Sequence, residues 1–318
     1  MHSKLQNFLG ESWNRYREVF LGELDSRIPL LNQINKYITD RGGKQLRPIL
    51  SLLSAIVCCG ECNDKVIRCA AASEMIHTAT LFHDDVADGS SMRRGASTLN
   101  SLYSPSTAVL VGDYWLSKAI CSLLSHCSAE IFTLFAKTLS DLAEGEMIQM
   151  ERAQTLETTF EDYISIIERK TASLFCASMR SAAIAANATA EQCDALYEYA
   201  YHLGIAFQMR DDILDYSPEF ATGKPIGQDI KEGKITLPLL GALSNSSPKD
   251  RKKIKRVFKY RFVQRTLKLV AKNGGLEYAQ NVLELEIDRA ISALSLFEDS
   301  EAKSHLINLA RKTVLRTK

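Results

Sequence analysis

Apolar residues recur with a helical period along most of this 318-residue chain. Between Ile131 and Leu142 they follow the i, i+3, i+4, i+7 spacing that places them on one face of a helix. The stripe continues at residues 174–177, and residues 182–190 are rich in alanine, which favours helices and their close approach. No stretch alternates apolar and polar residues for long enough to form a sheet. The pattern therefore predicts an all-α fold.

Short breaks separate the predicted helices. They fall at residues 41–43, 88–90, 104–106 and 216–234, where glycine, proline and serine gather. The whole chain has only 16 glycines and 7 prolines, which favours long, uninterrupted helices. The break at 216–234 is too short to link two globular domains and follows an acidic motif, so it indicates a functional loop. We expect one domain over residues 1–318.

The charge balance excludes a general attraction to nucleic acid. The 39 basic and 38 acidic residues leave a net charge of +1, so a negatively charged ligand must be met by local charges. The densest basic run, residues 251–256, leaves two interpretations open: a nucleic-acid contact, or a solvated helix that begins after Ser247-Pro248. The second is favoured because no aromatic residues are interleaved, and we expect no nucleic-acid partner.

The chain contains 8 cysteines, and Cys59-x-x-Cys62 resembles half of a zinc site. No second cysteine or histidine pair follows at zinc-like spacing, so reduced thiols in a cytosolic protein are the better explanation. Residues 1–10 lack the apolar segment of a signal peptide, and no stretch approaches the ~18 apolar residues of a membrane span. We therefore expect a cytoplasmic protein without a transmembrane segment.

Two acidic pentads with the pattern Asp-Asp-x-x-Asp provide the candidate chemistry. In residues 84–88 and 211–215, the first and last aspartates are four positions apart and share one helix face. Like charges at this spacing destabilise a helix unless a cation holds them, and carboxylates combined with phosphates favour Mg²⁺. A solvated acidic surface is the alternative, but apolar residues flank both pentads. The candidate metal ligands are Asp84, Asp85, Asp88, Asp211, Asp212 and Asp215.

Magnesium held by aspartates implies a polyphosphate ligand, and phosphates attract arginine and lysine. Three basic groups lie near helix breaks, although each alone fits a surface charge equally well. They are Lys44 with Arg47, Arg93 with Arg94, and Lys224 with Lys234.

Lys170, Thr171 and His77 lie inside apolar helical stretches. For Lys170-Thr171 one interpretation is a snorkelling lysine beside a threonine that bonds to the preceding turn. Such a bond can also bend the helix and expose a carbonyl to a cavity. His77 precedes Asp84 by two turns on the same face. A satisfied core histidine is one interpretation, and its place beside the pentad favours a phosphate contact.

These motifs resemble those of the trans-type polyprenyl diphosphate synthases, the polyprenyl synthetase family. They occur in the family's order between residues 42 and 238, and beyond Pro238 only generic helix is recognised. The matching segments are Gly42-Gly43-Lys44-x-x-Arg47-Pro48, Glu74-Met75-Ile76-His77, His83-Asp84-Asp85-x-x-Asp88, Arg93-Arg94-Gly95, Gly112-Asp113, Lys170-Thr171, Phe207-Gln208-x-x-Asp211-Asp212-x-x-Asp215, Gly223-Lys224, Gly227-x-Asp229 and Gly233-Lys234-x-Thr236-Leu237-Pro238.

The resemblance implies a single-domain helical bundle around a deep central cavity, usually in a homodimer. It also implies the 1′-4 head-to-tail condensation of isopentenyl diphosphate with an allylic diphosphate, with three Mg²⁺ ions bound beside the allylic substrate. Transient membrane contact during product release is left open. By the same resemblance, Asp84, Asp88 and Asp211 hold Mg²⁺ with support from Asp85, Asp212 and Asp215; Arg93, Lys170, Lys224 and the nearby Lys234 contact the allylic diphosphate; Lys44, Arg47, His77 and Arg94 bind isopentenyl diphosphate; and Thr171 and Gln208 line the reacting carbons.

The residue five positions before the first pentad tends to set product length in this family. Here it is Ala79, followed by Thr80, and Ala72 lies two turns deeper. Small residues leave room for a growing chain, so we expect a long-chain, all-trans product suited to a quinone side chain. The alternative is that Met75 or Ile76 closes the tunnel, as in a short-chain farnesyl or geranylgeranyl diphosphate synthase.

Two further functions fit parts of the pattern. A terpene cyclase of the ionisation-dependent type typically replaces the second pentad by a mixed Asn/Asp, Ser/Thr and Glu pattern. A non-catalytic partner subunit should have eroded pentads. Both pentads are intact here, which favours an active synthase.

Overall fold

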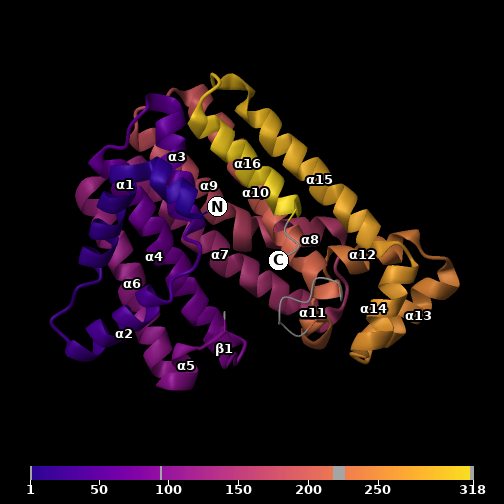
Figure 1. Ribbon diagram of the computed structural model, residues 1–318. Helices are drawn as coiled ribbons and strands as arrows, with labels where there is room; N and C mark the ends of the chain where they lie inside the picture. The colour runs from indigo at the N-terminus through magenta and orange to yellow at the C-terminus, as the bar shows by residue number, and fades with distance from the viewer. Residues whose placement is uncertain (1, 94, 218–225, 316–318) are drawn as a thin grey trace. The chain divides into compact units, whose positions relative to one another are not determined.

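The computed structural model describes residues 2–93, 95–217 and 226–315, and in these ranges it is almost entirely helical (Figure 1). Their only strands, β1 and β2, are two residues long and pair antiparallel. The prediction of an all-α fold is therefore confirmed. In chain order the elements are α1 (His2–Glu23), α2 (Pro29–Asp40), α3 (Leu46–Cys59), α4 (Asp64–Ala87), β1 (Met92–Arg93), β2 (Ala96–Ser97), α5 (Leu99–Leu102), α6 (Pro105–His126), α7 (Ala129–Thr155), α8 (Phe160–Ile167), η1 (Glu168–Ala172), α9 (Ser173–Ala185), α10 (Ala190–Tyr216), α11 (Gln228–Glu232), α12 (Leu237–Asn245), α13 (Pro248–Lys259), α14 (Val263–Lys272), α15 (Gly275–Ala293), η3 (Leu294–Leu296) and α16 (Glu301–Leu315).

Contacts divide the chain into two compact units, which are described separately. Unit 1 contains the residues up to Ala136, together with Ala177–Leu196 and Asp299–His305. Unit 2 contains Lys137–Cys176, Tyr197–Glu298 and the residues from Leu306 onward. The expectation of one domain over the whole chain stays a prediction.

Helix α4 is the buried centre of unit 1, where α1, α3 and α6 pack against it (Figure 1). Asn63 caps its N-terminus by accepting a hydrogen bond from the Val66 amide (3.0 Å). Buried residues occur on all its faces as far as Asp85, as expected of a helix surrounded by others. Helix α6 approaches closely at Gly112, where a Cβ would lie 2.3 Å from His83 Nε2. This packing fixes the end of α4 that bears the first pentad.

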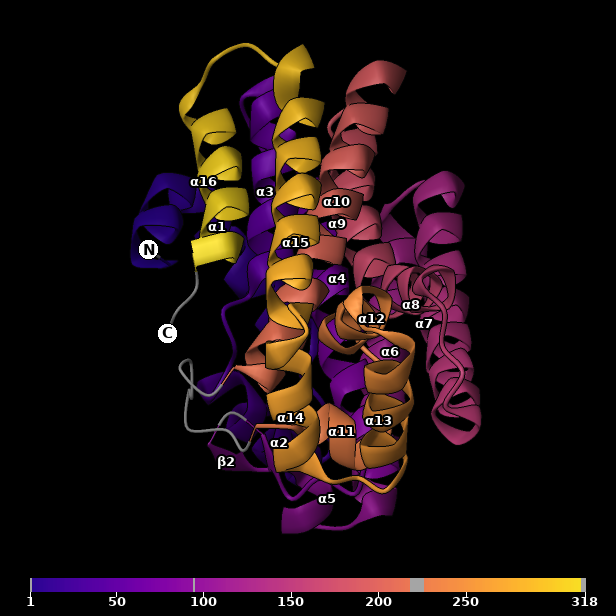
Figure 2. The ribbon, with the colours of Figure 1, turned by 90° about the vertical axis from the view of Figure 1, so that its right-hand side faces the viewer.

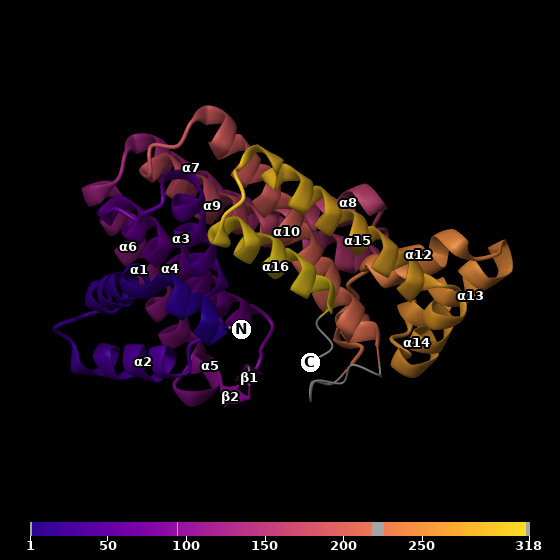
Figure 3. The same ribbon diagram turned by 45° about the horizontal axis from the view of Figure 1, so that its top comes forward.

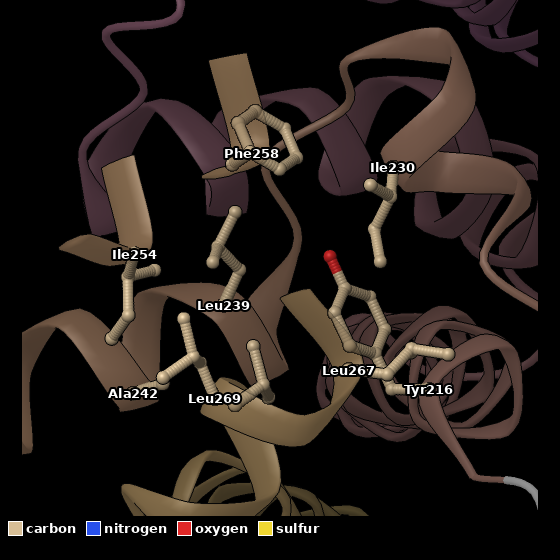
Figure 4. Close-up of a cluster of buried hydrophobic side chains, with 9 residues drawn as sticks. Tyr216, Ile230, Leu239, Ala242, Ile254, Phe258, Leu267 and Leu269 are labelled. Carbon is tan, nitrogen blue, oxygen red and sulfur yellow. The ribbon is translucent and has the colours of Figure 1, made fainter. Parts of the chain in front are cut away.

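In unit 2, α12 packs against α15 (Figure 2) and α13 against α14 (Figure 3). Gly241 allows the first of these contacts, because a Cβ there would lie 2.5 Å from the Tyr278 ring. A hydrophobic cluster then joins the C-terminal end of α10 to α11, α12, α13 and α14 (Figure 4). Its buried members are Tyr216, Ile230, Leu239, Ala242, Ile254, Phe258, Leu267, Leu269 and Val270.

Two local predictions need correction. The alanine-rich stretch 182–190 is not one helix, because α9 ends at Ala185 and Asn187 adopts a left-handed conformation (φ 57°). Thr189 then caps α10 by accepting a hydrogen bond from the Gln192 amide (3.3 Å). The expected loop at 216–234 contains the short helix α11, and its residues 218–225 lie outside the described ranges.

Helix α6 is the one helix of the described ranges that is long and apolar enough to cross a membrane, judged by length and composition only. In its most apolar stretch 39% of the residues are buried inside the protein. The sequence expectation that no stretch approaches a membrane span is therefore not met by α6. The difference arises because serines, Asp113 and Lys118 are interspersed among its apolar residues.

Candidate active site

The first acidic pentad lies at the C-terminal end of α4. Asp84 and Asp85 belong to its last turn, and Asp88 is the C-cap residue in a right-handed helical conformation. Asp84 is half-buried and Asp88 is exposed, while Asp85 is buried at 4% exposure. Asp84 and Asp88 therefore share a helix face, as the spacing predicts, and Asp85 faces the interior of unit 1.

Arg93 reaches the pentad from β1. Its Nε donates a hydrogen bond to Asp85 Oδ1 (2.7 Å). Burial raises the pKa of Asp85, and the neighbouring guanidinium opposes that effect. Asn100, which the sequence did not single out, donates to the backbone oxygens of Asp85 (3.2 Å) and Ser90 (3.1 Å) and so fixes the loop that carries Arg93. Arg94 lies outside the described residues.

The residues predicted for isopentenyl diphosphate are distributed over two helices of unit 1. Lys44 is exposed just before α3, and Arg47 is half-buried in the first turn of α3. Between them Gln45 is buried in a left-handed conformation (φ 46°), which sets the direction in which α3 begins. His77 is half-buried on α4.

The predicted chain-length residues lie in the buried middle of α4. Ala79 is completely buried (0% exposed), and so is Ala72. Thr80 is half-buried, and its hydroxyl donates to the His77 backbone oxygen (2.9 Å). Ala79 therefore lies inside the packed unit, where an added side chain must displace its neighbours.

A cavity of about 150 Å³ in unit 2 brings together five of the predicted site residues. The five come from separate segments of the chain: Lys170, Thr171, Gln208, Asp212 and Lys234. Ten other residues complete the lining: Gln149, Arg152, Ala153, Thr158, Tyr163, Ile166, Ile167, Asp229, Ile235 and Thr236.

Lys170 and Thr171 lie in the π-helical turn η1. Such wide turns are rare and occur often at functional sites. The Thr171 hydroxyl donates to Gln208 Oε1 (2.9 Å), so the suggestion that it bonds to the preceding turn is wrong. Helix α10 approaches this turn at Gly204, where a Cβ would lie 2.6 Å from the Ala172 Cα.

Asp212 is the buried end of a hydrogen-bond chain. Its Oδ1 accepts from Gln208 Nε2 (2.9 Å), and its Oδ2 accepts from the Tyr163 hydroxyl (2.7 Å). Burial, with a smaller contribution from the charges of Asp211 and Asp215, raises the pKa of Asp212 to about 7 against the opposing effect of the two donors. Positive charge supplied by a ligand would favour the ionised form.

Asp215 holds the start of α11 in place. Its carboxylate accepts from the backbone amides of Gln228 (2.9 Å) and Asp229 (3.0 Å). Asp229 is half-buried in the cavity wall, and removal of its carboxylate from water, together with Asp212 and Asp215, raises its pKa well above the usual value. Asp211, four positions before Asp215, is exposed.

The cavity lysines are paired with glutamates. Lys170 Nζ bonds to Glu146, and Lys234 Nζ lies 2.6 Å from Glu232 Oε2. Burial raises the pKa of Glu232, but Lys234 and other donors outweigh it and lower the pKa overall. These contacts hold both ammonium groups at the cavity, where an anionic ligand would meet them. Lys224 lies outside the described residues.

Both pentads offer hard carboxylate oxygens, the donor type that Mg²⁺ prefers. Among residues 2–93, 95–217 and 226–315, however, no three His, Cys, Asp or Glu side chains form a ready metal site. Mg²⁺ usually takes one or two protein carboxylates and completes its shell with water and substrate phosphates. The aspartates therefore fit Mg²⁺ that arrives with a diphosphate.

Sequence reasoning missed several members of the cavity wall. Tyr163 and Arg152 of the wall gave no signal, and neither did Glu146 and Glu232, the partners of the cavity lysines, since each belongs to an otherwise ordinary helical pattern. The Tyr163–Asp212 bond joins residues 49 positions apart, which no local spacing reveals. Asp229 was named from the sequence only as part of the motif Gly227-x-Asp229 and was assigned no role.

Comparisons with known proteins identify the family of the chain. The family profile described as "Polyprenyl synthetase" matches residues 28–272, so the likeness extends beyond Pro238. Octaprenyl diphosphate synthase of Haemophilus influenzae is 36% identical over 318 residues, covering 98% of this chain and 96% of that protein. All-trans-nonaprenyl-diphosphate synthase (geranyl-diphosphate specific) of Rhodobacter capsulatus is 38% identical over 298 residues, covering 92% and 91%.

A solved structure gives the same assignment. The crystal structure of a decaprenyl diphosphate synthase from Rhodobacter capsulatus covers 100% of both chains at a TM-score of 0.94 and 33% identity. Family, sequence and fold thus coincide over most of the chain. The chain therefore belongs to the polyprenyl synthetase family, and it is a prenyltransferase.

Proposed function

We propose that the chain condenses isopentenyl diphosphate with an allylic diphosphate, 1′-4 and head to tail, to make a long-chain all-trans polyprenyl diphosphate. The observation that carries the proposal is the unit 2 cavity, where Lys170, Thr171, Gln208, Asp212 and Lys234 line one space. The relatives described above are named as octaprenyl, nonaprenyl and decaprenyl diphosphate synthases, which supports a long product. A quinone side chain is the proposed use.

The cations of the chain bind and orient the two diphosphates. Lys170 and Lys234 present ammonium groups at the cavity, and their glutamate partners hold them there. We assign the remaining contacts as the family resemblance implies. Arg93 and Lys224 also contact the allylic diphosphate, and Lys44, Arg47, His77 and Arg94 bind isopentenyl diphosphate.

The aspartates of both pentads would hold Mg²⁺, with three ions bound beside the allylic diphosphate. When bound, Mg²⁺ neutralises the charge that develops on a departing diphosphate. Asp84, Asp88 and Asp211 are assigned to the metal directly. Asp212, which is buried between two donors, supports that arrangement together with Asp85 and Asp215.

Gln208 and Thr171 face the reacting carbons. Thr171 and Asp212 hold the Gln208 amide from its two ends, and the oxygen dipoles of Gln208 and Thr171 would stabilise positive charge on the allylic carbons. The diphosphate separates first and leaves an allylic cation, which the double bond of isopentenyl diphosphate, held close by its own cations, then attacks. We assign the lost proton to an oxygen of the released diphosphate: the residues lining the cavity include no histidine, and its two carboxyl groups, Asp212 and Asp229, already accept hydrogen bonds from Tyr163, Gln208 and Thr236.

A cytoplasmic location, a homodimer, and transient membrane contact during product release complete the proposal. No nucleic acid is involved. Ala79 and Thr80 are assigned to control of product length, as the family resemblance implies, and both lie in the middle of α4, where Ala79 is completely buried.

The test is incubation with Mg²⁺, labelled isopentenyl diphosphate and farnesyl diphosphate, followed by chromatography of the dephosphorylated products. A ladder ending in long chains is expected. Consumption of the allylic substrate without isopentenyl diphosphate would instead identify a terpene cyclase, and no product at all would indicate a non-catalytic subunit. Lys170→Met should weaken use of the allylic substrate, whereas the control Lys137→Met, at an exposed site of α7, should not.

A further inference from the structure

The segment formed by α13 and α14, residues 248–272, concentrates positive charge. It contains eleven lysines and arginines and a single acidic residue, Asp250, whereas the whole chain has a net charge of only +1. We call this segment the basic hairpin. A charge so unevenly placed generates a strong local field even when the overall balance is neutral.

The hairpin exposes its cations and buries its apolar side. Ile254 (0% exposed) and Phe258 (3%) pack into the hydrophobic cluster of unit 2 (Figure 4). No carboxylate of the described residues lies within 4.0 Å of an exposed cation of the hairpin. The exposed cations are Lys249, Arg251, Lys252, Lys253, Lys255, Arg256, Lys259, Arg265, Lys268 and Lys272.

Two aromatic residues, Tyr260 and Phe262, belong to the turn between α13 and α14. Tyr260 is 60% exposed and Phe262 is 48% exposed, and their ring centroids are 6.0 Å apart. Arg265 lies over the Phe262 ring at 5.3 Å. Rings of this kind, placed beside cations, suit the interface between lipid headgroups and acyl chains.

We propose that the basic hairpin docks this protein on an anionic lipid surface. Charge complementarity selects the partner, because the hairpin exposes ten cations, none of which lies within 4.0 Å of a carboxylate of the described residues. The apolar side of α13 is already packed against unit 2, so the contact is peripheral and electrostatic, with Tyr260 and Phe262 as shallow anchors. The role of this docking rests on the proposed function, because a long polyprenyl chain partitions from water into a bilayer.

The arrangement of aromatic residues favours a membrane over nucleic acid. Single-stranded nucleic acid is bound by aromatic side chains spread along a cationic groove, on which successive bases stack. Here the two exposed rings are adjacent at one turn, and α13 exposes no aromatic side chain, since its Phe258 is buried. A single shallow contact fits this distribution better than a row of stacked bases.

The hairpin is also joined to the wall of the candidate active site. Ile230 of α11 packs in the same cluster as Phe258, and a Cβ at Gly233 would lie 2.0 Å from the Arg261 guanidinium. Gly233 is adjacent to Lys234, which lines the cavity. The docked face and the cavity wall therefore share one packed core.

Docking should depend steeply on charge and salt. Each basic residue near an anionic bilayer contributes about 1 kcal/mol, or about fivefold in partition. Neutralising three cations of α13 should therefore weaken binding about 100-fold, and high salt should abolish most of it. The variant is Lys252→Gln, Lys255→Gln and Lys259→Gln combined.

The experiment is co-sedimentation of the full chain, without substrates, with vesicles of phosphatidylcholine alone or mixed with phosphatidylglycerol. The wild type should bind only the anionic vesicles, and the triple variant should not. The matched control, Lys4→Gln with Lys137→Gln and Lys312→Gln, removes the same charge from other exposed sites and should bind like the wild type. Equal binding by both triple variants would overturn the proposal.

Two further measurements sharpen the outcome. Tyr260→Ser with Phe262→Ser should lower partition while leaving its salt dependence intact; unchanged partition would refute the anchoring role. Tight binding of random-sequence single-stranded DNA that depends on the hairpin, without vesicle binding, would identify a nucleic-acid surface instead and overturn the proposal. Because no substrate is present, failure of vesicle binding is distinguishable from failure of synthase activity, which is measured separately without vesicles.

Discussion

Replacing Asp212 by asparagine should stabilise the metal-free protein at alkaline pH although it removes a proposed active-site group. Asp212 is 4% exposed, and burial raises its pKa from 3.8 to about 7. Between these values the folded state holds a proton that the unfolded state releases. The free energy of unfolding therefore falls as pH rises through this window, by about 1.4 kcal/mol per pH unit.

The magnitude follows from the width of the window. Above pH 7 the ionised carboxylate costs the folded protein about 4 kcal/mol relative to an acid with the usual pKa of 3.8. Asparagine does not titrate, but its amide would face the Gln208 donor, which costs about 1–3 kcal/mol at every pH. The free energy of unfolding of the variant, measured relative to wild type, should therefore rise by about 3 kcal/mol between pH 5 and pH 8. The cost at Gln208 is the same at every pH and does not change this difference.

The assay is thermal unfolding in the presence of a chelator across this pH range. For a chain of this size about 3 kcal/mol corresponds to roughly 6 °C in Tm. Asp211→Asn, at the exposed neighbouring position, is the control and should leave the pH dependence nearly unchanged. A Tm difference between Asp212→Asn and wild type that stays constant from pH 5 to pH 8 would refute the reasoning.

Three other predictions test neighbouring features. Tyr163→Phe removes the hydroxyl that donates to the Asp212 carboxylate, so it should move the acidic limb of the pH–rate profile upward by about one pH unit. The control Tyr199→Phe loses a buried hydrogen bond to a backbone oxygen (2.8 Å) and should reduce stability without moving that limb. Gly204→Ala would place a Cβ 2.6 Å from the Ala172 Cα and should destabilise the protein by about 1–3 kcal/mol in denaturant titrations. Unchanged stability would mean that η1 can move away from α10 without an energetic cost, which contradicts the prediction. Ala79→Phe fills a site that is 0% exposed and should shorten the products seen by chromatography, so an unchanged product ladder would contradict passage of the chain beside it.

Local pattern was sufficient for much of the architecture. The apolar period at 131–142 predicted a helix, and α7 extends over it with Ile131 and Phe135 buried. A helix was also expected after Ser247-Pro248, and α13 begins there, at Pro248, with Ser247 as its N-cap. The alanine-rich stretch 182–190 failed, because alanine propensity does not reveal that Asn187 takes a left-handed conformation between two helices.

The sequence by itself determined the helical class, the family and the identity of the charged groups. Period, spacing and residue type are local properties, and the pentads kept their predicted positions on α4 and α10. Only the tertiary structure decided which of these groups are buried. Asp212 depends on Tyr163, which is 49 positions away in sequence, and its pKa follows from burial that no spacing encodes. Burial and long-range hydrogen bonds arise when helices pack, because packing alone removes water from a side chain and brings a distant donor to it.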